Sequence, residues 1–126
     1  MKSLKLDLDI NELYTLNDFI NGIIQKEDCQ VQLIVEEIFV NIVNYSNSEY
    51  LKVNAEFKDS TLTIEFIDNG IQFNPLLKEN PTIPDTIDDA EIGGLGIFLT
   101  KEMADELNYQ YINGENHLTI IKEIES

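Results

Sequence analysis

Several residue types are scarce in this chain, and each scarcity argues against a class of protein. A single cysteine, Cys29, excludes an internal disulfide, and a single histidine, His117, argues against a zinc site. No apolar run is long enough to span a membrane, and no basic-then-apolar signal segment opens the sequence. We therefore expect a cytoplasmic protein with no membrane partner.

Basic residues are also scarce. Eight lysines and no arginine stand against 24 Asp and Glu, which gives a formal net charge of −16. Phosphate backbones require a basic footprint, so direct nucleic-acid binding is disfavoured. The acidity favours solubility and can steer the protein toward a basic partner surface.

The residues that are present predict one folded domain over 1–126. The length and the 43% hydrophobic content suffice for a real core. Apolar periodicity predicts the elements in order: strand 3–10, helix from Asn11 to Ile24, helix 30–46, a hairpin of strands 50–57 and 62–66 around Asp59-Ser60, an irregular segment 71–92, a helix with apolar Leu95, Phe98, Leu99, Met103 and Leu107, and a hairpin of strands 108–112 and 117–124 around Asn113-Gly114. This order predicts an α+β fold, a two-layer α/β sandwich with a mixed, mainly antiparallel sheet covered on one face by three helices.

Residues 30–46 are the stretch around which the rest is organised. Apolar positions cover most of this helix's circumference, which predicts a buried helix. One narrow seam is polar: Gln30, Glu37, Asn41 and Asn44 fall within about 60° of each other on a helical wheel. The seam is either a satisfied hydrogen-bond network or an edge that reaches water, or it lines a cavity for a polar ligand or metal ion. Glu37 and Asn41 are four residues apart, so one ion or water could touch both.

Two further stretches are typical of functional sites, although each alone is a weak signal. Asp68-Asn69-Gly70, followed by Phe73, comes directly after a strand. Gly93-Gly94-Leu95-Gly96 opens a helix, where exposed backbone N–H groups favour phosphate binding. These glycines fit neither the Walker loop nor the dinucleotide fingerprint. Between the two stretches, the irregular segment 71–92 carries all three prolines and is either a functional lid or a disordered loop.

Taken together and in this order, the three stretches resemble the GHKL ATPase superfamily, whose fold is shared by histidine-kinase catalytic domains, gyrase B and Hsp90. Glu37-x-x-x-Asn41 resembles the N box, Asp68-x-Gly70-x-x-Phe73-Asn74-Pro75 the first glycine box, and Gly94-Leu95-Gly96-Ile97-Phe98-Leu99 the second. The resemblance covers nearly the whole chain. Within the superfamily it is closest to the RsbW/SpoIIAB-like anti-sigma factors, which are serine-protein kinases and also single short domains.

The resemblance implies ATP and Mg²⁺ as cofactors and a role for each matching residue. Asn41 would give Mg²⁺ an amide oxygen, and Glu37 would be the catalytic base. Asp68 would accept from the adenine amino group, and Gly70 would let the backbone pass close to the base. Thr119 would support the adenine end, and residues 74–92 would form the ATP lid. The remaining nucleotide contacts would come from Asn44, Phe73, Gly93, Gly94, Leu95 and Gly96.

The phosphate end departs from the family. Relatives often carry an arginine before the second glycine box, whereas this chain has Asp88-Asp89-Ala90-Glu91-Ile92 there, with Lys78 and Lys101 the nearest cations. ATP binding is therefore a firmer expectation than fast phosphoryl transfer.

The family further implies three partners: a STAS-type anti-anti-sigma protein as substrate, a sigma factor that the chain sequesters, and a second copy in a homodimer. Two alternatives stay open: a GHKL module that regulates partners without catalysis, and a purely structural α/β domain.

Overall fold

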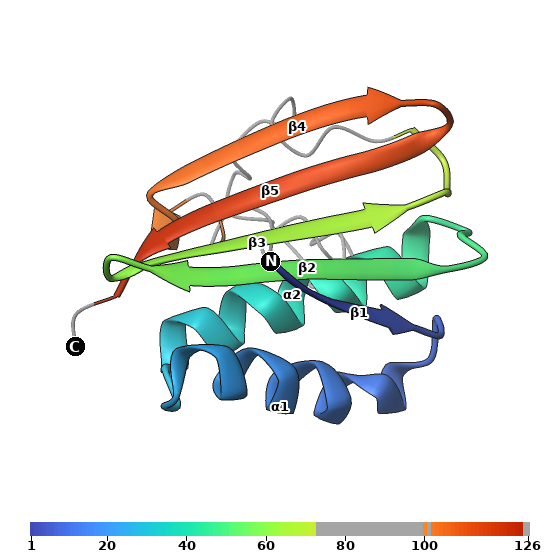
Figure 1. The fold of residues 1–126 in the computed structure, drawn as a ribbon. Helices are drawn as coiled ribbons and strands as arrows, with labels where there is room; N and C mark the ends of the chain where they lie inside the picture. Colours follow the sequence, from blue (N-terminus) through green and yellow to red (C-terminus); the bar gives the residue numbers. More distant parts are fainter. Residues whose placement is uncertain (73–99, 101, 125–126) are drawn as a thin grey trace, which may run out of the picture.

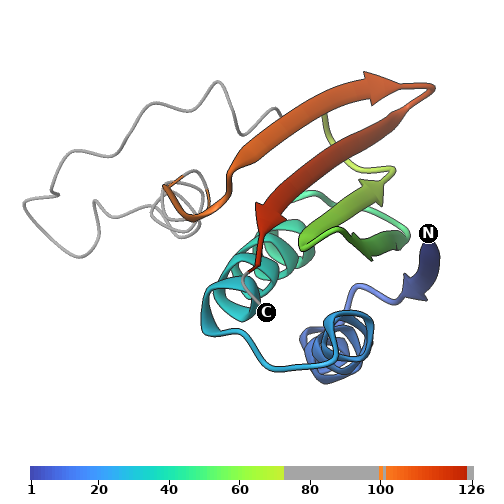
Figure 2. The same cartoon turned by 60° about the vertical axis from the view of Figure 1, so that its left-hand side comes forward.

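The computed structural model describes residues 1–72, 100 and 102–124, and its architecture confirms the predicted fold class (Figure 1). The elements are β1 (Lys2–Leu6), the 3₁₀ helix η1 (Ile10–Glu12), α1 (Leu13–Ile24), α2 (Cys29–Tyr45), β2 (Leu51–Lys58), β3 (Thr61–Asp68), β4 (Glu106–Ile112) and β5 (Glu115–Glu123). The five strands lie in the order β1-β2-β3-β5-β4, and all four neighbouring pairs are antiparallel. Helices α1 and α2 cover one face of the sheet, as the turned view shows (Figure 2).

Side-chain caps fix where the two helical segments begin. The Asp9 carboxylate accepts from the Asn11 N–H at 2.9 Å, so the 3₁₀ helix η1 starts at Ile10. Strand β1 therefore ends at Leu6, whereas the sequence pattern predicted that it continues to residue 10. The Asp28 carboxylate accepts from the Val31 N–H at 3.0 Å and starts α2. Such caps satisfy N–H groups that have no partner within the helix.

Both predicted hairpins are confirmed, and the backbone of their turns explains the residues found there. Asp59 and Ser60 have φ values of 53° and 64°, and Asn113 and Gly114 have 54° and 79°. Two consecutive residues with positive φ are the mark of a type I′ turn, whose twist matches that of paired strands. The turns set the register, with Lys58 opposite Thr61 and Ile112 opposite Glu115.

The core lies between the two helices and the sheet, with Leu16, Phe39 and Phe66 almost completely buried. The structure corrects one expectation for α2, which buries one face rather than most of its circumference. Its buried side chains are Val31, Ile34, Val35, Ile38, Phe39 and Ile42. Those of Leu33, Val40 and Val43 are half-buried, and those of Gln30, Glu36 and Asn44 are exposed.

The predicted third helix ends earlier than its apolar pattern suggested. Most of it and the irregular segment lie outside the described residues, but Thr100, Glu102 and Met103 are helical, and the Ala104 N–H donates to Thr100 O at 2.9 Å. The next residue turns into the sheet, because the Asp105 N–H donates to Ile121 O at 2.9 Å. Leu107 is therefore a residue of β4. The prediction that it belongs to the third helix was wrong. Among the described helices none is both long and apolar enough to cross a membrane.

Candidate functional site

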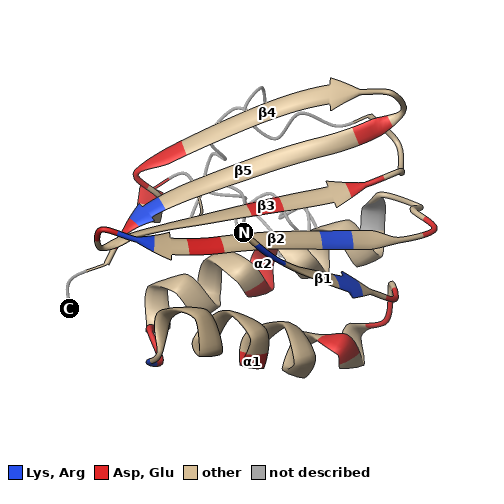
Figure 3. Ribbon diagram, in the orientation of Figure 1, with Lys and Arg blue, Asp and Glu red and all other residues tan. Residues whose placement is uncertain are grey.

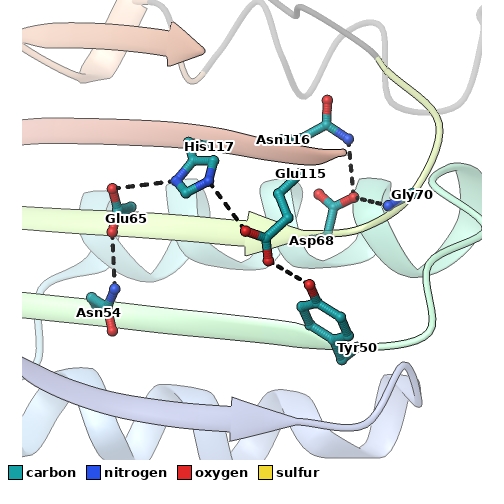
Figure 4. Close-up of polar contacts among 8 residues, drawn as sticks. All are labelled: Tyr50, Asn54, Glu65, Asp68, Gly70, Glu115, Asn116 and His117. Atoms are coloured by element: carbon teal, nitrogen blue, oxygen red, sulfur yellow. Dashed lines mark hydrogen bonds and ion pairs between the residues drawn. The ribbon is translucent and has the colours of Figure 1, made fainter. Parts of the chain in front are cut away.

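Asp68 is a buried carboxylate at the end of the central strand β3, with 5% of its surface exposed. It shares a sheet face with Phe66, toward the helices. Three donors converge on its Oδ1 atom: the Ser48 hydroxyl at 2.8 Å, the Gly70 N–H at 2.9 Å and the Asn116 Nδ2 amide at 3.1 Å. Figure 4 shows the last two contacts. Oδ2 has no hydrogen-bond partner among the described residues, so the contacts within this part of the chain all fall on one oxygen of the carboxylate.

Asn116, like Ser48, contacts Asp68 but was not predicted from the sequence. It lies opposite Asp68 in the β3–β5 ladder, and its amide also donates to Ile71 O at 2.9 Å. Its Oδ1 accepts from the Tyr109 hydroxyl. These contacts fix the amide plane, so Asn116 presents an N–H to the carboxylate in one orientation.

Thr119, which the resemblance assigned to the adenine end, does not lie beside Asp68. It pairs with Glu65 and stands three residues from Asn116, so its side chain points to the opposite face of the sheet. Strand parity could have shown this, because Asn116 is an even number of residues from the buried apolar Leu118 and Thr119 is not.

Gly70 is a glycine because no side chain fits at this position. A Cβ atom there would lie 2.2 Å from the carbonyl oxygen of Ser46 and 2.4 Å from the hydroxyl of Ser48. The Ile71 N–H donates to the same Ser46 carbonyl at 2.8 Å. Because it lacks a side chain, Gly70 allows the turn after β3 to pack closely against the C-terminal end of α2.

The polar seam of α2 is only partly buried. Glu37 and Asn41 are half-buried, whereas Gln30 and Asn44 are exposed. At 1.5 Å of rise per residue, Glu37 and Asn41 lie about 6 Å apart along the helix axis. Asn41 lies about 7.5 Å before Ser46, which contacts the Asp68 turn. The helix therefore places Asn41 between Glu37 and the buried carboxylate.

Several predicted site residues lie outside the described part of the chain. They are Phe73, Gly93, Gly94, Leu95 and Gly96, together with the lid segment 74–92 and both candidate cations, Lys78 and Lys101. Of the predicted site, the structure brings together Asp68 and Gly70 and sets Glu37 and Asn41 on the adjoining helix.

A second polar cluster crosses the outer face of the sheet, away from the helices (Figure 4). The Nδ1 atom of His117 lies 3.8 Å from a carboxylate oxygen of Glu65, and its Nε2 atom lies 3.6 Å from a carboxylate oxygen of Glu115. Asn54 Nδ2 donates to Glu65 at 2.9 Å, and the Tyr50 hydroxyl donates to Glu115. That last hydrogen bond is the main reason the pKa of Tyr50 is raised. This half-exposed cluster links neighbouring strands on the face of the sheet opposite Asp68, whose charge also contributes to raising the pKa of Tyr50.

Glu115, Asp68 and Glu49 all lie close enough to Tyr50 to help raise its pKa, so the charge at this end of the sheet is negative. Acidic residues are spread over both helices and the strands, and the lysines of the described residues are scattered among them (Figure 3). Lys122, the cation of β5, donates to Met103 O at 2.8 Å, where it satisfies a carbonyl at the end of the short helical stretch. The described part of the chain thus offers no basic patch for phosphates, which agrees with its charge of −16.

The serine/threonine-protein kinase BtrW of Bordetella bronchiseptica is 34% identical to this chain over 59 residues. That match covers 47% of this chain and 42% of BtrW, less than half of the relative's length.

Solved structures with a similar fold include histidine-kinase domains. The catalytic domain of histidine kinase ThkA has a TM-score of 0.58 at 13% identity, covering 98% of this chain and 97% of that one. Acinetobacter baumannii histidine kinase AdeS has a TM-score of 0.54 at 14% identity, covering 100% and 69%. The histidine kinase domain of a blue-light activated kinase from Erythrobacter litoralis gives 0.52 at 15%, covering 94% and 62%.

The family profile of the histidine kinase-like ATPase domain matches residues 15–122, which include α2, Asp68, Gly70 and Asn116. The chain therefore belongs to the histidine kinase-like ATPase domain family.

Proposed function

We propose that this chain is a protein kinase that binds ATP with Mg²⁺ and phosphorylates a serine of a partner protein. The single observation that carries the proposal is Asp68, a buried carboxylate whose Oδ1 accepts from three donors, whereas its Oδ2 accepts from none of the described residues. A carboxylate oxygen is a strong acceptor, and a hydrogen bond to it is strengthened by its charge. The exocyclic amino group of adenine is a hydrogen-bond donor, whereas the carbonyl that other purines carry at that position is not.

The described residues fit the base end of a nucleotide. Asp68 is held rigidly, so its Oδ2 oxygen is preorganised to accept, and burial strengthens the resulting hydrogen bond. Gly70 keeps the turn close to α2, so the carboxylate and the helix keep their relative places.

The phosphate end would be served by α2. Asn41 offers an amide oxygen, a hard ligand of the kind that Mg²⁺ prefers. Glu37 stands one helical turn earlier, where it can orient a serine hydroxyl and accept its proton. Mg-ATP, when bound, supplies the phosphoryl group and the metal charge that offsets negative charge on the phosphates. The half-burial of Glu37 and Asn41 leaves both side chains reachable from the side of α2 that does not face the core.

The identity of the partner rests on likeness alone. BtrW is a serine/threonine-protein kinase by name and shares 34% identity over 59 residues. Together with the RsbW/SpoIIAB-like pattern of motifs, this supports a STAS-type anti-anti-sigma protein as substrate, sequestration of a sigma factor, a homodimer and a cytoplasmic location. The acidic surface favours a partner with a basic contact face.

A second candidate function is a nucleotide-binding module that regulates partners without phosphorylating them. The observation that favours it is the absence of arginine from the whole sequence. A cationic group that stabilises the transferring phosphoryl can be worth several orders of magnitude in rate.

A phosphotransfer assay with the full chain tests both candidates. Radiolabelled ATP, Mg²⁺ and a STAS protein from the same cell are incubated with wild type, Glu37→Gln and Glu36→Gln. Glu36 is the matched control, since it is the neighbouring glutamate and is exposed on another side of α2. For the kinase we expect labelled serine that falls by roughly 10²–10⁴-fold in Glu37→Gln and stays near wild type in Glu36→Gln.

Other outcomes point elsewhere. Tight ATP binding with no labelled serine in the wild type favours the regulatory module. If millimolar Mg-ATP does not raise the melting temperature at all, nucleotide binding itself is wrong, because a ligand of the native state must stabilise it by mass action.

A further inference from the structure

We propose that Ser48 is a positioning residue for base recognition: its hydroxyl holds the Asp68 carboxylate in the plane that presents Oδ2 to the 6-amino group of adenine. The inference rests on the proposed nucleotide site and adds to it a residue outside the three family motifs. Ser48 follows the end of α2 and lies 20 positions before Asp68 in the sequence.

The three donors to Asp68 come from three different parts of the chain. Ser48 belongs to the connection between α2 and β2, Gly70 to the turn after β3, and Asn116 to β5. All three reach the same oxygen, Oδ1. A half-turn of the carboxylate only exchanges two equivalent oxygens, whereas any smaller rotation lengthens at least one of these bonds. The donors together therefore fix the plane of the carboxylate, and with it the direction of the Oδ2 lone pairs.

Ser48 is itself held by the last turn of α2. Its hydroxyl oxygen lies 2.6 Å from the Ser46 hydroxyl oxygen, and its backbone N–H donates to that same oxygen at 3.3 Å. The Ser46 hydroxyl also lies 2.6 Å from Ile42 O. Ser46 and Ser48 thus connect the backbone of α2 to the carboxylate of Asp68: the Ser46 hydroxyl donates to Ile42 O, the Ser48 N–H donates to the Ser46 hydroxyl oxygen, and the Ser48 hydroxyl donates to Asp68.

The other two donors to Asp68 also hold other parts of the fold in place, so their replacement would have wider effects than replacement of Ser48. The Gly70 N–H closes the turn back to Asp68, and Asn116 also bonds Ile71 O and Tyr109. Ser48 is half-buried, and replacing it by alanine removes one oxygen atom without opening a cavity in the apolar core. The loss falls on the orientation of Asp68, so it should be felt only by a ligand that bonds Oδ2.

A pair of nucleotides separates positioning from general damage. Equilibrium dissociation constants are measured by calorimetry with Mg²⁺ for ATP and for purine riboside 5′-triphosphate, which lacks only the 6-amino group. The proteins are wild type, Ser48→Ala, Ser48→Thr and the control Ser3→Ala. Ser3 also donates a hydroxyl hydrogen bond, at 2.6 Å to Asn54, but on the outer face of the sheet.

We expect Ser48→Ala to weaken ATP binding about tenfold, as loss of one hydrogen bond to a charged group would. Binding of the analogue should change less than about twofold, and Ser48→Thr should restore ATP binding, because it keeps the hydroxyl. An equal loss for both nucleotides would mean that Ser48 is merely structural, and no loss for either would mean that it does not orient Asp68; both results overturn the inference and leave the proposed function standing. A wild type that binds neither nucleotide overturns the proposed function, and the inference with it.

Discussion

Replacing Gly70 by alanine should destabilise the fold sharply, because the new methyl group would meet backbone. The added Cβ would lie 2.2 Å from the carbonyl oxygen of Ser46 and 2.8 Å from its carbonyl carbon. Overpacking of a filled site costs roughly 1–3 kcal/mol, and a backbone neighbour yields less readily than a side chain. The shift would also stretch the 2.8 Å bond from the Ile71 N–H to Ser46 O, worth about 1 kcal/mol. We expect a total loss of about 2–4 kcal/mol.

Urea denaturation followed by circular dichroism measures this loss, with Gly22→Ala as the matched control. Gly22 lies within α1 and has nothing within 4 Å of its added Cβ, so alanine there should stabilise the protein by about 0.5–1 kcal/mol. The two glycines therefore predict opposite signs for the same chemical change. A Gly70→Ala protein within about 0.5 kcal/mol of wild type would refute the packing argument, since surface substitutions fall in that range.

Three further perturbations have outcomes that the structure fixes in sign. Removing the cap of α2 with Asp28→Ala should cost about 1 kcal/mol in urea denaturation, because the Val31 N–H loses its 3.0 Å partner; an unchanged midpoint would show that the cap contributes nothing. Raising NaCl from about 0.05 to about 0.5 M should raise the melting temperature, because salt screens the self-repulsion of a chain with net charge −16; a lower melting temperature would contradict this. The pKa of Tyr50 lies above its usual 10.0 because its proton is donated to Glu115, so this hydrogen bond stabilises the fold below that pH and is lost as pH rises through the raised value. Spectrophotometric titration of Tyr50→Phe should therefore lose one tyrosinate that forms above pH 10.0 in the wild type, and an unchanged titration curve would disprove the assignment.

Local patterns in the sequence predicted most of the architecture because they are set by near neighbours. The alternation of apolar residues along β2 and β3, and the turn at Asp59-Ser60, depend only on residues a few positions apart. The limits of β1 and of the third helix were wrong because long-range or capping contacts decided them. Asp105 is drawn into the sheet by Ile121, a residue that no local pattern could have named.

The candidate site could be predicted only where a motif marks it. Asp68 and Gly70 stand in a recognisable run, whereas Ser48 and Asn116 are ordinary polar residues whose importance comes from where the fold places them. Thr119 was assigned to the adenine end by likeness to related proteins. In the structure it lies an odd number of residues from Asn116 along β5, so its side chain is on the face of the sheet opposite Asp68. The reason that Gly70 is a glycine was also invisible in the sequence, because its neighbour Ser46 is distant along the chain.

The strand order has a consequence for how the protein reaches its folded state. The β2–β3 and β4–β5 hairpins close through two-residue turns and can form quickly and independently. The β3–β5 ladder that joins them brings together Asp68 and Asn116 across 48 positions, and closing so long a loop is an entropically costly event. The buried carboxylate gains its full set of donors only once the two hairpins have paired, so a nucleotide that engages it would select chains in which this pairing has already formed.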